Sequence, residues 1–232
     1  MKILLIGYGK MGKAIEKIAV ERGHEIAGRI DIHDAPPFPP ADVAIEFSTP
    51  ESVAGNVRQC IDQGIPVVVG TTGWAGSRQE IEDYCRKKNG ALLSSSNFSL
   101  GVNIFFQLNQ RLAQFMNGHP SYEVSIDETH HTQKKDAPSG TAITLAEGIL
   151  KFLGRKKKWA LNQKADDTIT IQSHRIDPAP GTHVVTYSSP IDSIEIRHTA
   201  FSREGFALGA VMVAEWIRNK KGVLTMDEFL KF

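Results

Sequence analysis

Three glycines near the N-terminus constrain the fold more than any other feature of this sequence. Gly7, Gly9 and Gly12 follow a short apolar run at residues 2–6 and open an amphipathic stretch at residues 10–22. The run is typical of a buried strand and the stretch of a helix. In this setting the first glycine permits a tight turn, the second admits a pyrophosphate and the third allows close packing of helix and strand. The spacing predicts a dinucleotide-binding unit, although a turn of this kind can also serve packing alone.

The first hundred residues continue the same alternation of strand and helix. Further strands are predicted at residues 25–30, 42–47, 65–69 and 91–94, and helices are predicted from Pro50 and over residues 77–88. Strands that alternate with helices in this way form parallel sheets. The expected fold of this part is a Rossmann-type, doubly wound parallel sheet.

The pattern changes after about residue 100. Residues 121–128 alternate apolar and polar side chains, as do residues 168–173, 183–188 and 193–199, whereas residues 103–116 and 139–153 have helical periodicity. Strands with one polar face fit an open mixed sheet. We therefore expect a second α+β domain at residues 101–202. The first domain would comprise residues 1–100, completed by residues 203–232 with helices at 205–218 and 225–232.

Composition argues against nucleic acid and membrane as partners. The net charge is +1 and 41% of the 232 residues are hydrophobic. No long apolar segment is present, and the N-terminal run is too short for a signal peptide. The dense charge run, residues 155–158, is better explained by the helix end at Gly154 than by a nucleic-acid contact. With two cysteines, Cys60 and Cys85, we expect buried thiols and a cytoplasmic protein.

Several loops after the predicted strands are candidate cofactor contacts. Asp31 ends the second strand, where an acid takes the ribose hydroxyls, and Arg29 should lie on the same strand face. The acid should repel the 2′-phosphate of NADPH and the arginine could offset this, so we expect NADH to be used at least as well as NADPH. The remaining candidates are loop residues with small side chains or exposed amides: Gly7, Tyr8, Gly9, Lys10, Met11, Gly12, Gly70, Thr71, Thr72, Ser95, Ser96, Asn97 and Phe98.

A second cluster lies in the middle of the chain. His130 and His131 follow a predicted strand, so their side chains should point to opposite sides if it continues, and Lys134 comes shortly after them. A lysine suits a carboxylate and can donate a proton. Ser139 is a candidate N-cap whose helix would present the amides of Gly140 and Thr141 as an anion cradle.

Two other interpretations of this cluster are open. The histidine pair could bind a metal with Glu128 or Asp136, but adjacent histidines on a strand rarely converge on one ion. A solvated loop before an ordinary capped helix explains Ser139 but leaves two histidines and a lysine without a purpose. We therefore expect no metal at this site.

The segment from Glu128 to Ala142, Glu-Thr-His-His-Thr-Gln-Lys-Lys-Asp-Ala-Pro-Ser-Gly-Thr-Ala, resembles the hallmark of the 4-hydroxy-tetrahydrodipicolinate (dihydrodipicolinate) reductase family. The similarity extends over essentially the whole chain. It includes residues 7–12, Val-Gly-Thr-Thr-Gly at 69–73, Asn-Phe-Ser-Leu-Gly-Val-Asn at 97–103 and Arg-Glu-Gly-Phe at 203–206. The central motif is highly specific, whereas the glycine loop is shared with many dehydrogenases.

The resemblance implies a role for each part of the site. His130 would serve acid–base catalysis and Lys134 would be the other proton donor. His131, Ser139, Gly140 and Thr141 would bind the substrate carboxylates, and Thr72 would lie near the reacting ring. The glycine loop is one residue shorter than in many members, no acid–arginine pair is obvious after the second strand, and Gln133 stands where some members have a basic residue. These departures concern cofactor preference and leave the reaction class unchanged.

The expected function is reduction of 4-hydroxy-tetrahydrodipicolinate by NADH or NADPH to tetrahydrodipicolinate, in lysine and diaminopimelate biosynthesis. The cofactor would bind the first domain and the dicarboxylate substrate the second, so turnover would require domain closure. The resemblance also implies a homotetramer assembled through the sheet of the second domain. Two alternatives stay open: another dehydrogenase of small acids, and a dinucleotide sensor without catalytic activity.

Overall fold

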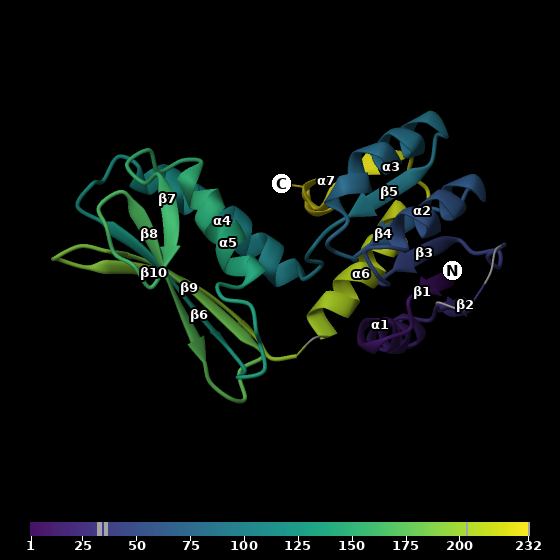
Figure 1. Cartoon of the computed structure of the whole chain (residues 1–232), viewed down its shortest axis with the longest axis horizontal. Helices are drawn as coiled ribbons and strands as arrows, with labels where there is room; N and C mark the ends of the chain where they lie inside the picture. The colour runs from purple at the N-terminus through teal and green to yellow at the C-terminus, as the bar shows by residue number, and fades with distance from the viewer. Residues whose placement is uncertain (32–33, 35–36, 203, 232) are drawn as a thin grey trace. The chain divides into compact units, whose positions relative to one another are not determined.

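The computed structural model describes every residue except 32, 33, 35, 36, 203 and 232. Four residues between the predicted strands at 25–30 and 42–47, Arg203 of the C-terminal motif and Phe232 therefore lie outside the described residues. The chain divides into two compact units (Figure 1). The first comprises Met1–Leu100 with Glu204–Phe232, and the second comprises Gly101–Arg203.

The first unit contains a parallel sheet of six strands in the order β11-β5-β4-β3-β1-β2. The strands are β1 (Lys2–Ile6), β2 (Glu25–Ile30), β3 (Val43–Glu46), β4 (Val67–Val69), β5 (Ala91–Ser94) and β11 (Gly222–Leu224). The chain leaves β1 toward β2 on one side and returns to β3 on the other. This reversal makes the carboxyl end of β1 a topological switch point, where ligands of such sheets bind.

Helices cover both faces of this sheet because its strands are apolar on both sides. On one face α1 (Lys10–Glu21) and α6 (Glu204–Ile217) bury Ile15 and Ala210 against Ile3 and Leu5. On the other face α2 (Val53–Asp62) and α3 (Ala75–Lys87) pack around Leu4, Ile6 and Leu92. The short helix α7 (Met226–Leu230) begins at a Thr225–Glu228 capping box.

The second unit contains a five-stranded mixed sheet in the order β10-β9-β6-β8-β7. Its strands are β6 (Glu123–His130), β7 (Lys158–Leu161), β8 (Thr168–Arg175), β9 (Gly181–Ser188) and β10 (Ser193–Ala200). β6 runs parallel to β8 and antiparallel to β9. The predicted fold class, a Rossmann-type sheet with a second open mixed sheet, is confirmed.

Two helices, α4 (Leu100–Met116) and α5 (Gly140–Leu150), lie beside one another along one face of the second sheet (Figure 1). Ile126, Ile171 and Val185 point into this layer and are fully buried with Leu145 and Ile149. Alternate residues of β6 face the other side and are exposed or half-buried. Period-two patterning therefore gives each strand one face for the core and one for the surface.

Several predicted boundaries were wrong. The strand expected at residues 121–128 extends to His130, because β6 keeps its pairing with β8 as far as His130 and Arg175. The helix expected from Pro50 begins at Val53. Strands β7 and β11 were not predicted, since they have only four and three residues and show no clear alternation.

The charge run at residues 155–158 is structural. Lys156 is buried and its Nζ donates to the Glu123 carboxylate and to the Asp166 carbonyl, at 2.6 and 2.8 Å. Arg155 donates to two backbone carbonyls, those of Met116 and Tyr122. The helix before the run ends at Leu150, with Lys151 as its C-cap, and not at Gly154 as expected.

The state of the two cysteines and the length of the helices match what the sequence predicts. Cys60 and Cys85 are both buried free thiols. Among the described residues, no helix has the length and apolar character needed to cross a bilayer.

Candidate functional site

The glycine loop lies between β1 and α1, as predicted. Gly7 has a φ of +87°, and a side chain there would overlap the carbonyl of Phe47. A side chain at Gly12 would likewise overlap the carbonyl of Gly7. Gly9 is different, since a side chain there would meet nothing within 4 Å. The fold therefore requires glycine at positions 7 and 12, whereas Gly9 leaves open space before the first amides of α1, where a phosphate group fits.

A cavity of about 360 Å³ opens beside this loop. It is lined by the ends of three strands, namely Ile6 to Gly9 after β1, Ile30, Asp31 and Asp34 after β2, and Phe47 to Thr49 after β3, together with Ser52 and Asn56 of the α2 segment. Asp31 therefore lies where the sequence placed a ribose contact. Ser48 and Thr49 were missed, although polar residues directly after a buried strand are the same signal that identified Asp31.

The other predicted cofactor loops end neighbouring strands of the same sheet edge. The Gly70 amide donates to the Glu46 carbonyl, and the Ser95 amide donates to the Val69 carbonyl at 3.0 Å. Ser96 and Thr72 are exposed, whereas Phe98 is buried. Asn97 caps the start of the next turn by accepting from the Ser99 amide. Parallel strands end on one edge, so these loops and the glycine loop share it.

The buried carboxyl group of Glu46 connects the loop after β3 to the loop after β4. Glu46 ends β3 and has no exposed surface. Thr71 donates to it at 2.6 Å, and Ser48 and Asn56 donate to its other oxygen. Burial raises the pKa of Glu46 above its usual value, and these hydrogen bonds only partly offset the effect. The hydroxyl of Thr71 is thus used inside the protein, which leaves the exposed Thr72 as the residue free to face a ligand.

Arg29, a candidate contact for the 2′-phosphate of NADPH, has its guanidinium bonded to Glu16. Its Nε donates to the Glu16 carboxylate at 2.9 Å, and its Nη2 makes a second contact with the same group. The guanidinium also lies 5.5 Å from the ring centre of Tyr8, whose hydroxyl donates to Glu16. Hydrogen bonds from Arg29 and Tyr8 lower the pKa of Glu16 to about 2. The carboxylate therefore stays ionised and holds the arginine.

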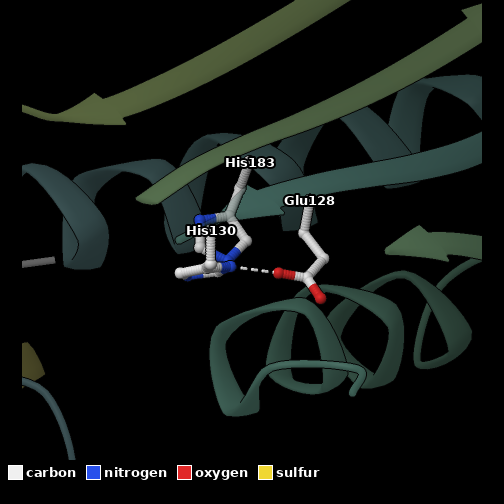
Figure 2. Close-up of side chains that lie close together, drawn as sticks. All are labelled: Glu128, His130 and His183. Carbon is white, nitrogen blue, oxygen red and sulfur yellow. Dashed lines mark hydrogen bonds and ion pairs between the residues drawn. The ribbon is translucent and has the colours of Figure 1, made fainter. Parts of the chain in front are cut away.

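In the second unit, polar residues occupy the end of the inward face of the sheet (Figure 2). Val124 and Ile126 of β6 are buried in the core, and the next residues of the same parity are Glu128 and His130. In β8 the inward series Ile169, Ile171 ends in Ser173 and Arg175, and in β9 the buried Tyr187 and Val185 share their face with His183. The inward-facing side chains of β6, β8 and β9 are therefore apolar along most of each strand and ionisable at one end.

The Glu128 carboxylate is the centre of this cluster. It has no exposed surface, and its Oε2 is hydrogen-bonded to Nδ1 of His130. Its Oε1 accepts from Nη2 of Arg175 at 3.0 Å. Burial would raise the pKa of Glu128, but hydrogen bonds, of which that from His130 has the largest effect, outweigh it and lower that pKa to about 2. Glu128 is therefore an anion, which can only accept the hydrogen bond that it shares with Nδ1 of His130.

His183 joins the cluster from β9. Its ring meets that of His130 edge to face at a centroid distance of 5.0 Å (Figure 2). Its Nε2 lies 2.9 Å from Oγ of Ser139. Burial, and next the charge of His130, lower the pKa of His183 to about 3, so this ring is neutral near pH 7. Ser139 also accepts from the Ala142 amide as the N-cap of α5, which confirms the predicted cap.

The remaining predicted residues lie in the loop after β6 and at the start of α5. Nδ1 of His131 is buried and has no hydrogen-bond partner in the described part of the chain. Nζ of Lys134 donates to both oxygens of Asp136, at 2.8 and 2.7 Å. Gly140 and Thr141 open α5, and a side chain at Gly140 would meet nothing within 4 Å. An unpaired ring nitrogen, a lysine and open amides are groups that bind a carboxylate.

Glu128, His130 and His183 also offer ligand atoms within 4.8 Å of one another, which is compatible in distance with a metal ion. Two contacts argue against that use. The carboxylate already bonds directly to Nδ1 of His130, and the Arg175 cation donates to its other oxygen. An added cation would have to displace the first contact and lie near the second, so the cluster fits a hydrogen-bonded network better.

A glycine-loop sheet with a ligand cavity, joined to a unit with a carboxylate–histidine pair beside a helix N-terminus, defines a dinucleotide-dependent oxidoreductase. The N-terminal model of dihydrodipicolinate reductase matches residues 1–98, and the C-terminal model matches residues 101–230. The chain belongs to the dihydrodipicolinate reductase family.

Individual relatives agree with this assignment. The chain is 49% identical to the 4-hydroxy-tetrahydrodipicolinate reductase of Christiangramia forsetii, over 99% of this chain and 98% of that protein. It is 35% identical to the enzyme of the same name from Thermosipho africanus, over 100% and 98% of the two chains. Among solved structures, it is similar in fold to a dipicolinate-bound dihydrodipicolinate reductase from Paenisporosarcina, with a TM-score of 0.78, 22% identity and 98% of each chain covered.

Proposed function

We propose that this protein reduces 4-hydroxy-tetrahydrodipicolinate to tetrahydrodipicolinate with NADH or NADPH, in the biosynthesis of diaminopimelate and lysine. Two relatives that bear the name of that enzyme match this chain over 98% of their own length. The structural observation that supports the proposal most directly is the buried Glu128–His130 pair beside the open N-terminus of α5. That pair supplies an oriented imidazole next to a site suited to carboxylates.

The first unit is the dinucleotide-binding unit. The residues present fit the cofactor, because Gly9 leaves open space at the N-terminus of α1 and Asp31 lines the adjoining cavity. When bound, the cofactor supplies the hydride. The protein's residues hold its pyrophosphate at the amides of α1 and its ribose at Asp31. Residues 70–72 and 95–98 would lie along its nicotinamide half.

His130 and Lys134 are proposed to serve proton transfer. Arrival of a hydride leaves negative charge on the substrate ring, so a nearby acid lowers the barrier. Nδ1 of His130 is bound to Glu128, which leaves Nε2 as the nitrogen available for proton transfer. Lys134, whose ammonium is held by Asp136, is a cation of the loop that follows His130.

The substrate carries two carboxylates, and the second unit offers partners for them. His131 has a buried, unpaired Nδ1 within the described structure, and Gly140 and Thr141 begin α5. Ser139 contributes as the cap that fixes this helix end, since its hydroxyl is already bonded to His183 and to the Ala142 amide. A helix N-terminus stabilises an anion through its free amides and its dipole.

The test follows oxidation of NADH, by its absorbance, with freshly generated substrate and with dipicolinate as a competitor. We expect turnover, and inhibition by dipicolinate that is competitive with the substrate. NADH oxidation with other keto or imino acids only would favour another small-acid dehydrogenase. Tight cofactor binding without any turnover would favour a sensor.

We further propose that the protein works in the cytoplasm as a homotetramer assembled through the second sheet. The support is the family resemblance, together with the sheet face opposite α4 and α5, which no helix of its own unit covers in the described structure. Light scattering coupled to size-exclusion chromatography measures the mass directly. A particle of one or two chains at micromolar concentration would contradict the tetramer.

A further inference from the structure

Arg175 connects the two parts of the catalytic segment that carry the proposed proton donors. It ends β8, directly opposite His130 in the parallel pairing with β6. Its Nη2 donates to the Glu128 carboxylate at 3.0 Å and to the Asp136 carbonyl at 2.7 Å. Its Nε donates to the Lys134 carbonyl at 3.3 Å. One guanidinium thus bonds to the carboxylate that holds His130 and to the backbone that carries Lys134.

We propose that Arg175 and Glu128 are positioning residues that fix His130 and Lys134 in one arrangement. This inference rests on the proposed reductase function. Neither residue needs to touch the substrate. Glu128 sets which ring nitrogen of His130 carries the proton, and Arg175 keeps the loop at residues 131–136 beside it.

The chemistry of the guanidinium suits this position better than that of an ammonium group. Its planar fork donates in several fixed directions, so it can bond to a carboxylate and to two carbonyls from different segments at once. Arg175 is about one-fifth exposed, at 21%, whereas Glu128 has no exposed surface. Burial keeps water from replacing these bonds and makes the arrangement rigid.

His130 is also confined on the side away from Glu128. Gly181 of β9 lies against it, and an added Cβ there would be 3.1 Å from Nε2. His183 packs edge to face against the ring (Figure 2). The imidazole is therefore held by a hydrogen bond at one nitrogen and by contacts with β9, which leaves little freedom for rotation.

Two substitutions separate the parts of the proposal. Arg175→Lys keeps the positive charge but cannot reach the three acceptors together, and Glu128→Gln keeps the shape but removes the charge. Because a displacement of about 1 Å lowers rates by about a hundredfold, we expect kcat to fall at least tenfold in each variant. The Kd for NADH should stay within about twofold, since the cofactor loops belong to the other unit.

The chain offers a matched control for each variant. Arg78 donates to Glu82 on α3 of the first unit and is exposed, so Arg78→Lys makes the same change at a surface pair. Glu215 in the first unit is bonded to His24 and to Arg22, so Glu215→Gln removes the charge of another carboxylate that holds a histidine and an arginine. Both controls should keep kcat within about twofold, since neither pair lines the cofactor cavity or contacts the Glu128 cluster.

Chemical rescue provides a readout that a general loss of structure would not give. In Arg175→Ala, millimolar guanidinium chloride should restore part of the lost kcat, whereas the same concentration of sodium chloride should not. Heteronuclear NMR of the histidine ring nitrogens in the unmodified protein gives a second measurement without any variant. We expect a proton on Nδ1 of His130.

The outcomes are distinct. A folded Arg175→Lys variant with unchanged kcat, or a bare Nδ1 with the proton on Nε2 alone, would overturn the proposal. The NMR result stands even if a variant fails to fold. Absence of reductase activity in the unmodified protein would instead overturn the proposed function, and the two failures are therefore distinguishable.

Discussion

Nε2 of His183 lies 2.9 Å from the Ser139 hydroxyl, and this buried pair joins β9 to the first turn of α5. Because burial lowers the pKa of His183 to about 3, the folded protein keeps this ring neutral while the unfolded chain protonates it near pH 6.5. The stabilising effect of the neutral ring is thus fully present above pH 6.5 and is lost as the pH falls toward 3. His183→Gln removes this titration.

The free energy of unfolding, measured with urea at several pH values between about 7 and 4, checks this expectation. The advantage of the unmodified protein over His183→Gln should shrink with falling pH, by at most about 1.4 kcal/mol per pH unit. His198, whose pKa is also lowered by burial, contributes equally to both proteins and cancels. A difference that is constant over this range would contradict the assignment of a neutral His183.

His130→Ala should abolish most of the activity without weakening cofactor binding. Removal of a general acid lowers kcat by about two to four powers of ten. NADH binding should be unchanged, because the glycine loop and the cavity beside it belong to the first unit. Steady-state kinetics and a fluorescence titration with NADH measure the two quantities. Wild-type kcat in this variant would remove His130 from the mechanism.

Gly181→Ala should lower kcat even though it adds only a methyl group. The new Cβ would be 3.1 Å from Nε2 of His130, which is closer than most such contacts, and the ring has to shift. We expect a loss of roughly tenfold or more, as for other small displacements of a catalytic group. Gly76→Ala in α3 is the matched control, because a side chain there meets nothing within 4 Å and kcat should not change. Equal kcat in both variants would argue against tight confinement of the ring.

Glu16→Ala should shift the cofactor preference toward NADPH. In the unmodified protein Glu16 holds Arg29, so we expect NADH to be used at least as well as NADPH. Release of the guanidinium makes it available to the 2′-phosphate, a charge-assisted contact worth roughly tenfold in kcat/KM. The ratio of kcat/KM for the two cofactors, measured for both proteins, is the readout. A hundredfold preference for NADPH in the unmodified protein would contradict the roles of Asp31 and Glu16.

Gly7→Ala should destabilise the first unit. The residue has a φ of +87°, and a side chain would overlap the Phe47 carbonyl, so we expect a loss of more than about 2 kcal/mol in the free energy of unfolding. Gly55→Ala in α2 serves as the comparison, since it adds a methyl group in open space and should be neutral or stabilising by about 0.5–1 kcal/mol. Similar effects at the two positions in chemical denaturation would show that Gly7 is not required by the turn.

The local patterns that predict the fold are strong in this chain. Strands β1, β2 and β5 have the predicted bounds, because each is a short apolar or β-branched run with a turn on either side. The end of β6 and the existence of β7 depend on pairing with β8, which lies far away in sequence. Such pairing leaves no local signal, so these boundaries were wrong or missing.

The candidate site was predictable only in part for the same reason. His130, His131 and Lys134 lie within a few residues of one another and were found from their spacing, but Arg175 and His183 come from other strands. A signal was nevertheless present. Glu128 and His130 have the inward parity of Val124 and Ile126, and an acid on the apolar face of a strand requires a buried partner. The sequence alone does not indicate that Arg175 is the cationic partner of Glu128.

The inward face of the second sheet is apolar along most of β6, β8 and β9 and ionisable at one end. The buried apolar side chains and the ionisable side chains of the candidate site therefore come from the same three strands. Glu128, Arg175 and His183 approach one another only when these strands have paired along their length. The groups around His130 are consequently arranged by the same strand pairing that completes the sheet, so this cluster and the core of the second unit cannot form separately.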